Sequence, residues 1–169
     1  MLKKVTKRYK NVQMGIECSA FYDRNVKTVL NCAQRAVLYP LSPLYDLENH
    51  SLTPEFKKAL IRIFRILDSD LDGKLYDSEM NTLQERVFQS ELNIEDIKAI
   101  KDTIIEELES DHQDYIELQG FFALQKKCIE MLKIQICWSI LRHFNYNDNL
   151  RLQINQENFT SEELLGDTI

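Results

Sequence analysis

The sequence predicts a mainly α-helical fold, and three observations lead to this prediction. Only four glycines and three prolines occur in 169 residues, which favours long helices over a turn-rich sheet. Apolar residues recur every three or four positions over most of the chain, as they do in amphipathic helices. Hydrophobic residues make up 44% and charged residues 28% of the chain, a balance typical of one or two compact units with a buried core.

Charge is distributed unevenly along the chain, whose formal net charge is −6. The first ten residues carry five basic and no acidic side chains, so the remaining chain holds 16 basic and 27 acidic residues. An acidic body argues against a nucleic-acid partner and suits a protein that binds cations. The basic start has two interpretations: a short targeting peptide or, more common in proteins, a solvated charged end.

Cysteine, histidine and hydropathy patterns narrow the class of protein further. The four cysteines form no Cys-x-x-Cys pair and the three histidines are scattered, so we expect reduced thiols, a cytosolic setting and no zinc site. No run of 18 uncharged apolar residues occurs, because Glu130 and Lys133 interrupt the nearest one, 129–141. We therefore expect no membrane span and no secretory signal in this chain.

The first 39 residues predict one strand followed by one helix. Alternating apolar residues predict a strand over 12–18, and apolar residues at helical spacing predict a helix of about three turns over 26–37. Pro40 ends this helix and opens an extended linker over 40–52. One strand and one helix cannot bury their own apolar faces, so 1–39 is interpreted as the end of a larger α/β domain.

From Thr53 to residue 144 the pattern is wholly helical and predicts five helices. Thr53 is a good N-cap and Pro54 suits the first helical position, so the first helix begins there and runs to Leu67. The other four are predicted over 80–88, from the N-cap Asn93 to 108 with Ile94, Ile97, Ile104, Ile105 and Leu108 inward, over 121–128, and over 134–144. The tail predicts a strand-like step at 150–152 and a polar helix near 159–165.

Between the first two of these helices lies a twelve-residue loop, 68–79, that matches every fixed position of the EF-hand pattern D-x-D-x-D-G-x5-E. Ca²⁺ is a hard ion that takes six to eight oxygen ligands at about 2.3–2.6 Å. Carboxylates at loop positions 1, 3 and 5, a carbonyl at 7, position 9 and a bidentate glutamate at 12 provide them, while glycine at 6 permits the sharp turn. The candidate metal ligands are therefore Asp68, Asp70, Asp72, Lys74 (carbonyl), Tyr76 and Glu79.

The same loop can also be interpreted as a solvated acidic loop that binds no ion. Tyr76 at position 9 supports this alternative, because that position usually carries a small polar residue that holds a bridging water. If the loop does bind Ca²⁺, Mg²⁺ is its possible competitor. Ion binding would then relieve the mutual repulsion of four carboxylates and stabilise the fold.

EF-hands usually pair, so a second loop is expected after the first. Aligning Ile116 with Leu75 places three acidic or amide residues of 109–113 at positions 1, 3 and 5. Asp114 then stands where glycine is needed, and Gly120 stands where the bidentate glutamate is needed. We expect this second hand to be a structural partner that does not bind Ca²⁺.

Six segments in order resemble one protein family. Glu-Cys-Ser-Ala at 17–20 resembles the last guanine-contacting loop of Ras-like GTPases, with Ser19 and Ala20 as the nucleotide-binding remnant, and the helix ending at Pro40 resembles the final helix of a Rho-type domain. The other segments are 43–46, 62–66, the loop 68–79 and 138–146. Together they resemble the Miro family, the mitochondrial Rho GTPases, over nearly the entire chain.

This resemblance implies an EF-hand pair over 53–144 and, in 145–169, a ligand-mimic helix within 150–165 that docks in the groove of its own pair. It also implies that 1–39 is the end of a GTPase domain. Members of the family are anchored in the outer mitochondrial membrane, face the cytosol and link mitochondria to motor adaptors, with Ca²⁺ modulating transport. We therefore expect protein partners for this chain and a place at that cytosolic face.

Departures from the family pattern decide what we expect of this chain itself. It has no G-x4-G-K-[S/T] loop to bind nucleotide phosphates and no Asn-Lys-x-Asp motif to bind the guanine base. We therefore expect neither GTP binding nor enzyme activity. The chain is interpreted as a fragment whose function is that of a Ca²⁺-binding interaction module. Two alternatives stay open: a GTP-binding protein as part of a longer chain, and a helical scaffold whose loop never fills.

Overall fold

The computed structural model describes residues 15–108 and 114–153, and these residues are mainly helical, as predicted. The helices are α2 (Val26–Leu38), α3 (Pro54–Leu67), α4 (Asp77–Phe88), α5 (Ile94–Leu108), α6 (Leu118–Glu130) and α7 (Ile134–His143). The short strands β1 (Tyr45–Asp46) and β2 (Ser51–Leu52) pair with each other, and so do β3 (Lys74–Leu75) and β4 (Ile116–Glu117), both pairs antiparallel. None of the described helices is long and apolar enough to cross a membrane.

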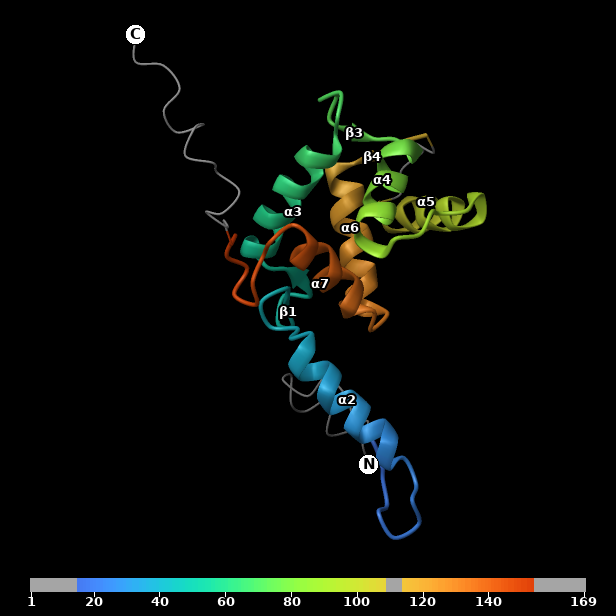
Figure 1. Ribbon diagram of the computed structural model, residues 1–169, viewed down its shortest axis with the longest axis vertical. Coiled ribbons are helices and arrows are strands. Elements are labelled where there is room, and N and C mark those ends of the chain that lie inside the picture. Colours follow the sequence, from blue (N-terminus) through green and yellow to red (C-terminus); the bar gives the residue numbers. More distant parts are fainter. Residues whose placement is uncertain (1–14, 109–113, 154–169) are drawn as a thin grey trace, which may run out of the picture.

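Helix α2 projects away from the body formed by the other helices (Figure 1). It begins and ends close to its predicted limits, but it contains no buried residue. Of the predicted strand, 12–14 lie outside the described residues, and 15–18 have no regular structure. The turn that follows is closed by reciprocal backbone hydrogen bonds of 3.0 and 2.9 Å between Ser19 and Arg24.

Two arginines and a tryptophan tie the C-terminal end of α2 to the body. Arg35 donates to the carbonyl oxygen of Leu132 at 3.1 Å, at the turn between α6 and α7. Arg142 of α7 donates to the carbonyl oxygen of Leu38 at 2.6 Å. Trp138 Nε1 donates to the carbonyl oxygen of Pro40 at 2.9 Å. The end of α2 is therefore held by α7 and the turn before it.

The segment between α2 and α3 is part of the core and not the extended linker that the prolines predicted. Leu41, Leu44, Tyr45 and Leu52 are all buried, because the β1–β2 hairpin turns their side chains toward the helices. Thr53 caps α3 as predicted, accepting from the Phe56 backbone N–H at 3.2 Å. The predicted domain limits at 39/40, 52/53 and 144/145 stay predictions.

Two helix–loop–helix units, α3–α4 and α5–α6, lie side by side and are joined through β3 and β4. Leu75 of β3 stands opposite Ile116 of β4, which is the register that the sequence alignment of the two loops predicted. Across the pair, the rings of Phe64 on α3 and Phe121 on α6 meet edge to face with centroids 5.9 Å apart. Asn93 caps α5 as expected, accepting from the Asp96 backbone N–H at 2.7 Å. The predicted EF-hand pair is confirmed.

The inward face predicted for α5 is wrong at its two ends. Ile94 is 86% exposed and Leu108 is 41% exposed, and Ile104 is the one buried residue of this helix. The reason is that α5 lies at the edge of the body and packs mainly on α6 (Figure 1). A Cβ on Gly120 of α6 would lie 3.0 Å from Ile104 Cγ2 and 3.1 Å from Ile116 Cγ2, so the missing side chain permits this close approach.

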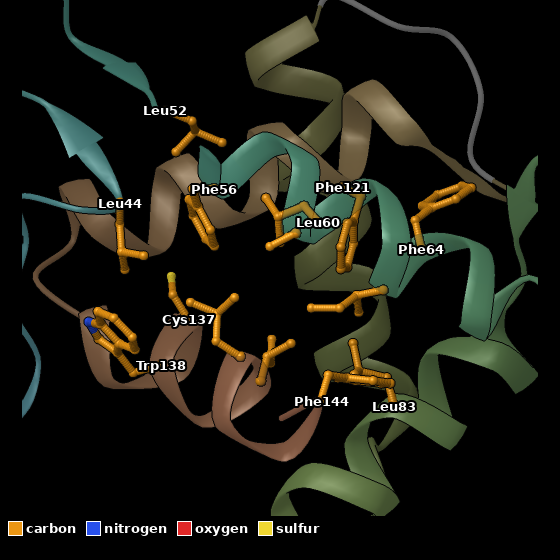
Figure 2. Packing of buried hydrophobic residues seen from close by; sticks show 14 of the residues in the cluster. Leu44, Leu52, Phe56, Leu60, Phe64, Leu83, Phe121, Cys137, Trp138 and Phe144 are labelled. Atoms are coloured by element: carbon orange, nitrogen blue, oxygen red, sulfur yellow. The ribbon is translucent and has the colours of Figure 1, made fainter. Parts of the chain in front are cut away.

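Helix α7 fills the apolar groove between the helices of the pair. It packs on α4 and α6, and its side chains Cys137 and Trp138 point toward Leu44 and Phe56 (Figure 2). Both α7 residues are fully buried. Helix α7 thus lies in the groove of the pair, while most of the ligand-mimic segment that the resemblance implied over 150–165 lies outside the described residues.

The described chain after α7 stays in contact with the core, where Tyr146 is buried and Leu150 is partly buried. Tyr146 and Leu152 form an isolated antiparallel bridge, which corresponds to the strand-like step predicted at 150–152. The polar helix predicted near 159–165 lies outside the described residues.

Candidate metal centre

The acidic loop 68–79 connects α3 to α4 and takes its two end ligands from these helices. Asp68 is the C-cap of α3, and Glu79 lies in the first turn of α4. Gly73 has a positive φ of 81°, which only glycine adopts without strain, so the turn at loop position 6 is made as the pattern requires. The site is therefore built between two helix ends that the apolar core holds in place.

Three of the four predicted carboxylates converge. One oxygen from each of Asp68, Asp70 and Glu79 lies within 4.8 Å of the others. Asp68 and Glu79 are only 6% and 7% exposed, whereas Asp70 is exposed and forms the open side. Three negative charges this close, two of them buried, repel one another, so a bound cation would stabilise the arrangement. An all-oxygen donor set of carboxylates fits a hard divalent ion and not a thiophilic one.

Backbone N–H groups of the loop orient the first ligand. Asp68 accepts at Oδ1 from the Asp72 backbone N–H at 3.2 Å and at Oδ2 from the Gly73 backbone N–H at 3.0 Å. Because these donors come from residues four and five further on, the loop closes around the Asp68 carboxylate. Its position is thus fixed by the fold of the loop itself.

Glu79 points into the loop and is held there by three hydrogen bonds. Its Oε1 accepts from the backbone N–H and the hydroxyl of Ser69, both at 2.8 Å, and its Oε2 accepts from the Tyr76 backbone N–H at 3.0 Å. Burial raises the pKa of Glu79, but these hydrogen bonds outweigh it and leave the pKa below its ordinary value. The carboxylate is therefore charged and preorganised for the role of the bidentate ligand.

Ser69 is the site residue that the sequence pattern did not identify. The EF-hand pattern leaves loop position 2 free, so nothing in the spacing distinguishes this serine from its neighbours. In the structure, its backbone and side chain both donate to Glu79 Oε1, which joins the first turn of the loop to its last residue.

Asp72 lies apart from the three converging carboxylates. Its Oδ1 accepts from the Lys74 backbone N–H at 2.8 Å, and its Oδ2 accepts from the Tyr76 hydroxyl at 3.1 Å. The same hydrogen bond, with burial and the nearby charge of Asp72 adding to it, raises the pKa of the Tyr76 hydroxyl. The Lys74 ammonium lies 4.1 Å from the ring centroid of Tyr115, which precedes β4.

The second loop lies beside the first but presents a different set of groups. Residues 109–113, which include the predicted positions 1, 3 and 5, lie outside the described residues. Gly120, at the position of the bidentate glutamate, is buried close to Ile104 and Ile116, so even a Cβ there would require these side chains to shift by a few tenths of an ångström. That this hand does not bind Ca²⁺ stays a prediction.

The predicted nucleotide-binding remnant is remote from the acidic loop. Ser19 and Ala20 lie in the turn before α2, at the end of this helix that points away from the body (Figure 1). Ser19 Oγ accepts from the Tyr22 backbone N–H at 3.3 Å, so it serves the local turn. The role of these two residues in nucleotide binding also stays a prediction.

Two helix–loop–helix units joined through short antiparallel strands, with one acidic loop of the complete EF-hand pattern, define a paired EF-hand protein. A protein-family model described as "EF hand associated" matches residues 90–160, the second hand and the groove-filling helix α7.

Known proteins extend this likeness over nearly the whole chain. It is 33% identical to Mitochondrial Rho GTPase 1 of Mycosarcoma maydis, over 90% of this chain and 24% of the relative. It is 32% identical to Mitochondrial Rho GTPase 1 of Arabidopsis thaliana, over 100% of this chain and 25% of the relative. With Mitochondrial Rho GTPase 1 of Caenorhabditis briggsae the identity is 40%, over 83% of this chain and 22% of the relative.

The resemblance to the mitochondrial Rho GTPase family is therefore confirmed, and this chain is related to that family. The chain spans about a quarter of the length of these relatives.

Proposed function

We propose that this chain is a calcium-binding regulatory module whose ion site is formed by Asp68, Asp70, Asp72, Lys74 (carbonyl), Tyr76 (carbonyl or a bound water) and Glu79. The observation that supports this proposal most directly is the convergence of three carboxylates, from two helix ends and the loop between them, to within 4.8 Å. Hydrogen bonds from the loop hold Asp68 and Glu79 in place, and a bound cation would offset the repulsion that remains among the three charges.

The chemistry of the donors favours Ca²⁺ over other ions. The pattern offers one bidentate and three monodentate carboxylates plus a carbonyl and position 9, which together match the six to eight oxygens that Ca²⁺ takes. Mg²⁺ is smaller and demands a near-ideal octahedron, so it is the competitor to test and not the preferred ligand. Neither sulfur nor imidazole joins the cluster of described ligands, which disfavours zinc.

Ion binding would act on the angle between α3 and α4. Asp68 belongs to the end of α3 and Glu79 to the start of α4, so an ion held by both carboxylates fixes one helix relative to the other. Because α7 already fills the groove of the pair, we expect the helices to move less than in a calcium sensor that opens an empty groove.

Titration calorimetry at near-physiological Mg²⁺ tests the proposal. We expect wild-type protein to give a Ca²⁺ binding heat for one site, and the double variant Asp68→Ala/Glu79→Gln to give none while its far-ultraviolet circular dichroism stays nearly unchanged. Glu85→Gln is the matched control, because it removes an exposed carboxylate from α4 outside the loop. If the wild-type protein gives no heat, the chain is a helical scaffold with a loop that does not fill.

The wider role rests on the relatives. From their name we propose that this module serves a mitochondrial Rho GTPase. From the family resemblance we further propose that it works at the cytosolic face of the mitochondrial outer membrane, where Ca²⁺ would modulate contacts with motor adaptors and so mitochondrial transport. The alternative function is GTP binding and hydrolysis as part of a longer chain. Measuring the binding of a fluorescent guanine nucleotide distinguishes the two functions. We expect no binding to this polypeptide, since its sequence has no G-x4-G-K-[S/T] loop.

A further inference from the structure

The fourth carboxylate of the loop is held by a side chain that the EF-hand pattern does not include. Asp68, Asp70 and Glu79 converge, but Asp72 is not within 4.8 Å of all three. One oxygen of Asp72, Oδ1, accepts from the Lys74 backbone N–H, a bond within the loop that leaves the other oxygen for an ion. That other oxygen, Oδ2, accepts from the Tyr76 hydroxyl at 3.1 Å. The tyrosine therefore competes with an ion for this oxygen and fixes the direction in which the Asp72 carboxylate points.

Tyr76 is itself held in place by the second hand. Its ring meets the ring of Tyr115 edge to face, with centroids 6.2 Å apart and planes at 62°. The ammonium of Lys74 lies 4.1 Å from the centroid of the same Tyr115 ring, which binds β3 to the segment before β4. An edge-to-face pair at this distance is favourable, so it biases the Tyr76 ring toward this position. The hydroxyl of Tyr76 is thus presented to Asp72 by packing against the hand that lacks the ligand set.

We infer that Tyr76 is a positioning residue that lowers the calcium affinity of the loop by holding Asp72 away from the other three carboxylates. We call the Tyr76–Asp72 hydrogen bond the tyrosine latch. This inference rests on the proposed function, because it concerns the same ion site. When an ion binds, Asp72 Oδ2 must leave the phenolic hydrogen and turn toward Asp68, Asp70 and Glu79. The second hand then influences the affinity of the first through Tyr115, whose ring contacts the ring of Tyr76.

Removal of the hydroxyl tests the latch. A hydrogen bond to a charged acceptor on a partly exposed loop corresponds to roughly threefold to tenfold in an equilibrium constant. We therefore expect Tyr76→Phe to lower the Ca²⁺ dissociation constant by about this factor in titration calorimetry. Tyr115→Ala should change it in the same direction by a smaller factor, because the hydroxyl of Tyr76 remains. Tyr22→Phe is the matched control, since it removes an exposed phenolic hydroxyl in the turn before α2.

An unchanged or higher dissociation constant for Tyr76→Phe would overturn the latch while leaving the calcium site standing. A second measurement decides the matter without calcium. In chelator-treated protein, Tyr76→Phe should shift the side-chain carboxyl ¹³C resonance of Asp72 and leave that of Asp68 nearly unmoved. If the Asp72 resonance does not shift, no latch exists. If instead the wild-type protein binds no Ca²⁺, the proposed function fails, and the carboxyl resonance still shows whether Tyr76 holds Asp72.

Discussion

Replacement of Gly120 by alanine measures how closely α5 approaches α6. The substitution has two opposite effects on the free energy of unfolding. In a helix interior, alanine is favoured over glycine by about 1 kcal/mol. Against this, the new Cβ would lie 3.0 Å from Ile104 Cγ2 and 3.1 Å from Ile116 Cγ2, both on buried side chains, and overpacking of this kind costs about 1–3 kcal/mol. We expect the second effect to win and the free energy of unfolding to fall by about 1 kcal/mol.

Urea unfolding followed by circular dichroism gives this free energy, and a double-mutant cycle assigns its cause. Ile104→Ala removes the nearer methyl group, so adding Gly120→Ala to that background should cost less than adding it to the wild type. If Gly120→Ala raises the stability of the wild-type protein, α5 moves away freely and the close approach is not a constraint. Equal costs in both backgrounds would show that Ile104 is not the residue that resists.

Three further predictions concern other parts of the structure. Trp138→Phe should lower stability by about 1.5–3 kcal/mol in urea unfolding, because it removes the 2.9 Å hydrogen bond to the Pro40 carbonyl and leaves a void; Tyr22→Phe should leave stability unchanged. Leu71→Asn should raise the melting temperature by an amount equivalent to about 0.5 kcal/mol, since Leu71 is 79% exposed at a φ of 61°, where asparagine is less strained; an unchanged or lower melting temperature would contradict this. A hydrogen bond from Lys126 at 2.8 Å holds the pKa of Glu107 below its ordinary value. This pair should therefore stabilise the fold fully at a pH above that ordinary value and lose its contribution of roughly 0.5 kcal/mol as the pH falls through the lowered pKa. Glu107→Gln should flatten that part of the curve of stability against pH, and an unaltered curve would refute the assignment.

The sequence predicts those parts of the fold that local chemistry decides. Thr53 followed by Pro54 fixed the start of α3, and the hydrogen bond from the Phe56 N–H is the one that an N-cap threonine accepts. The register of Leu75 opposite Ile116 followed from the fixed length of an EF-hand loop. Helices α4 and α6 begin three residues before their predicted starts. The first turn of α4 carries polar residues of the loop, and in α6 Gln119 and Gly120 separate Leu118 from the apolar run that starts at Phe121.

Other features depend on contacts between distant segments, which periodicity does not reveal. The exposure of Ile94 is decided by the place of α5 at the edge of the body. The burial of Leu44 depends on the β1–β2 hairpin folding back onto α7. At the candidate site, the pattern gave the candidate ligands, but the contact of Tyr76 with Tyr115 joins residues from two loops and could not be read from either loop alone.

The filled groove determines how calcium binding at the proposed site would be observed. Helix α7 lies against α4, whose first turn carries the site residue Glu79. The side chains of Trp138 and Arg142 on α7 donate hydrogen bonds to the carbonyls of Pro40 and Leu38 at the end of α2. A rotation of α4 that opened the groove would therefore have to expose α7 and break these bonds. We therefore expect ion binding to raise the free energy of unfolding and not to drive opening of the groove. The increase is about 2.7 kcal/mol when the Ca²⁺ concentration exceeds the dissociation constant a hundredfold. We thus expect calcium to raise the melting temperature and slow amide exchange in α4 and α7, while the binding of apolar dyes stays unchanged.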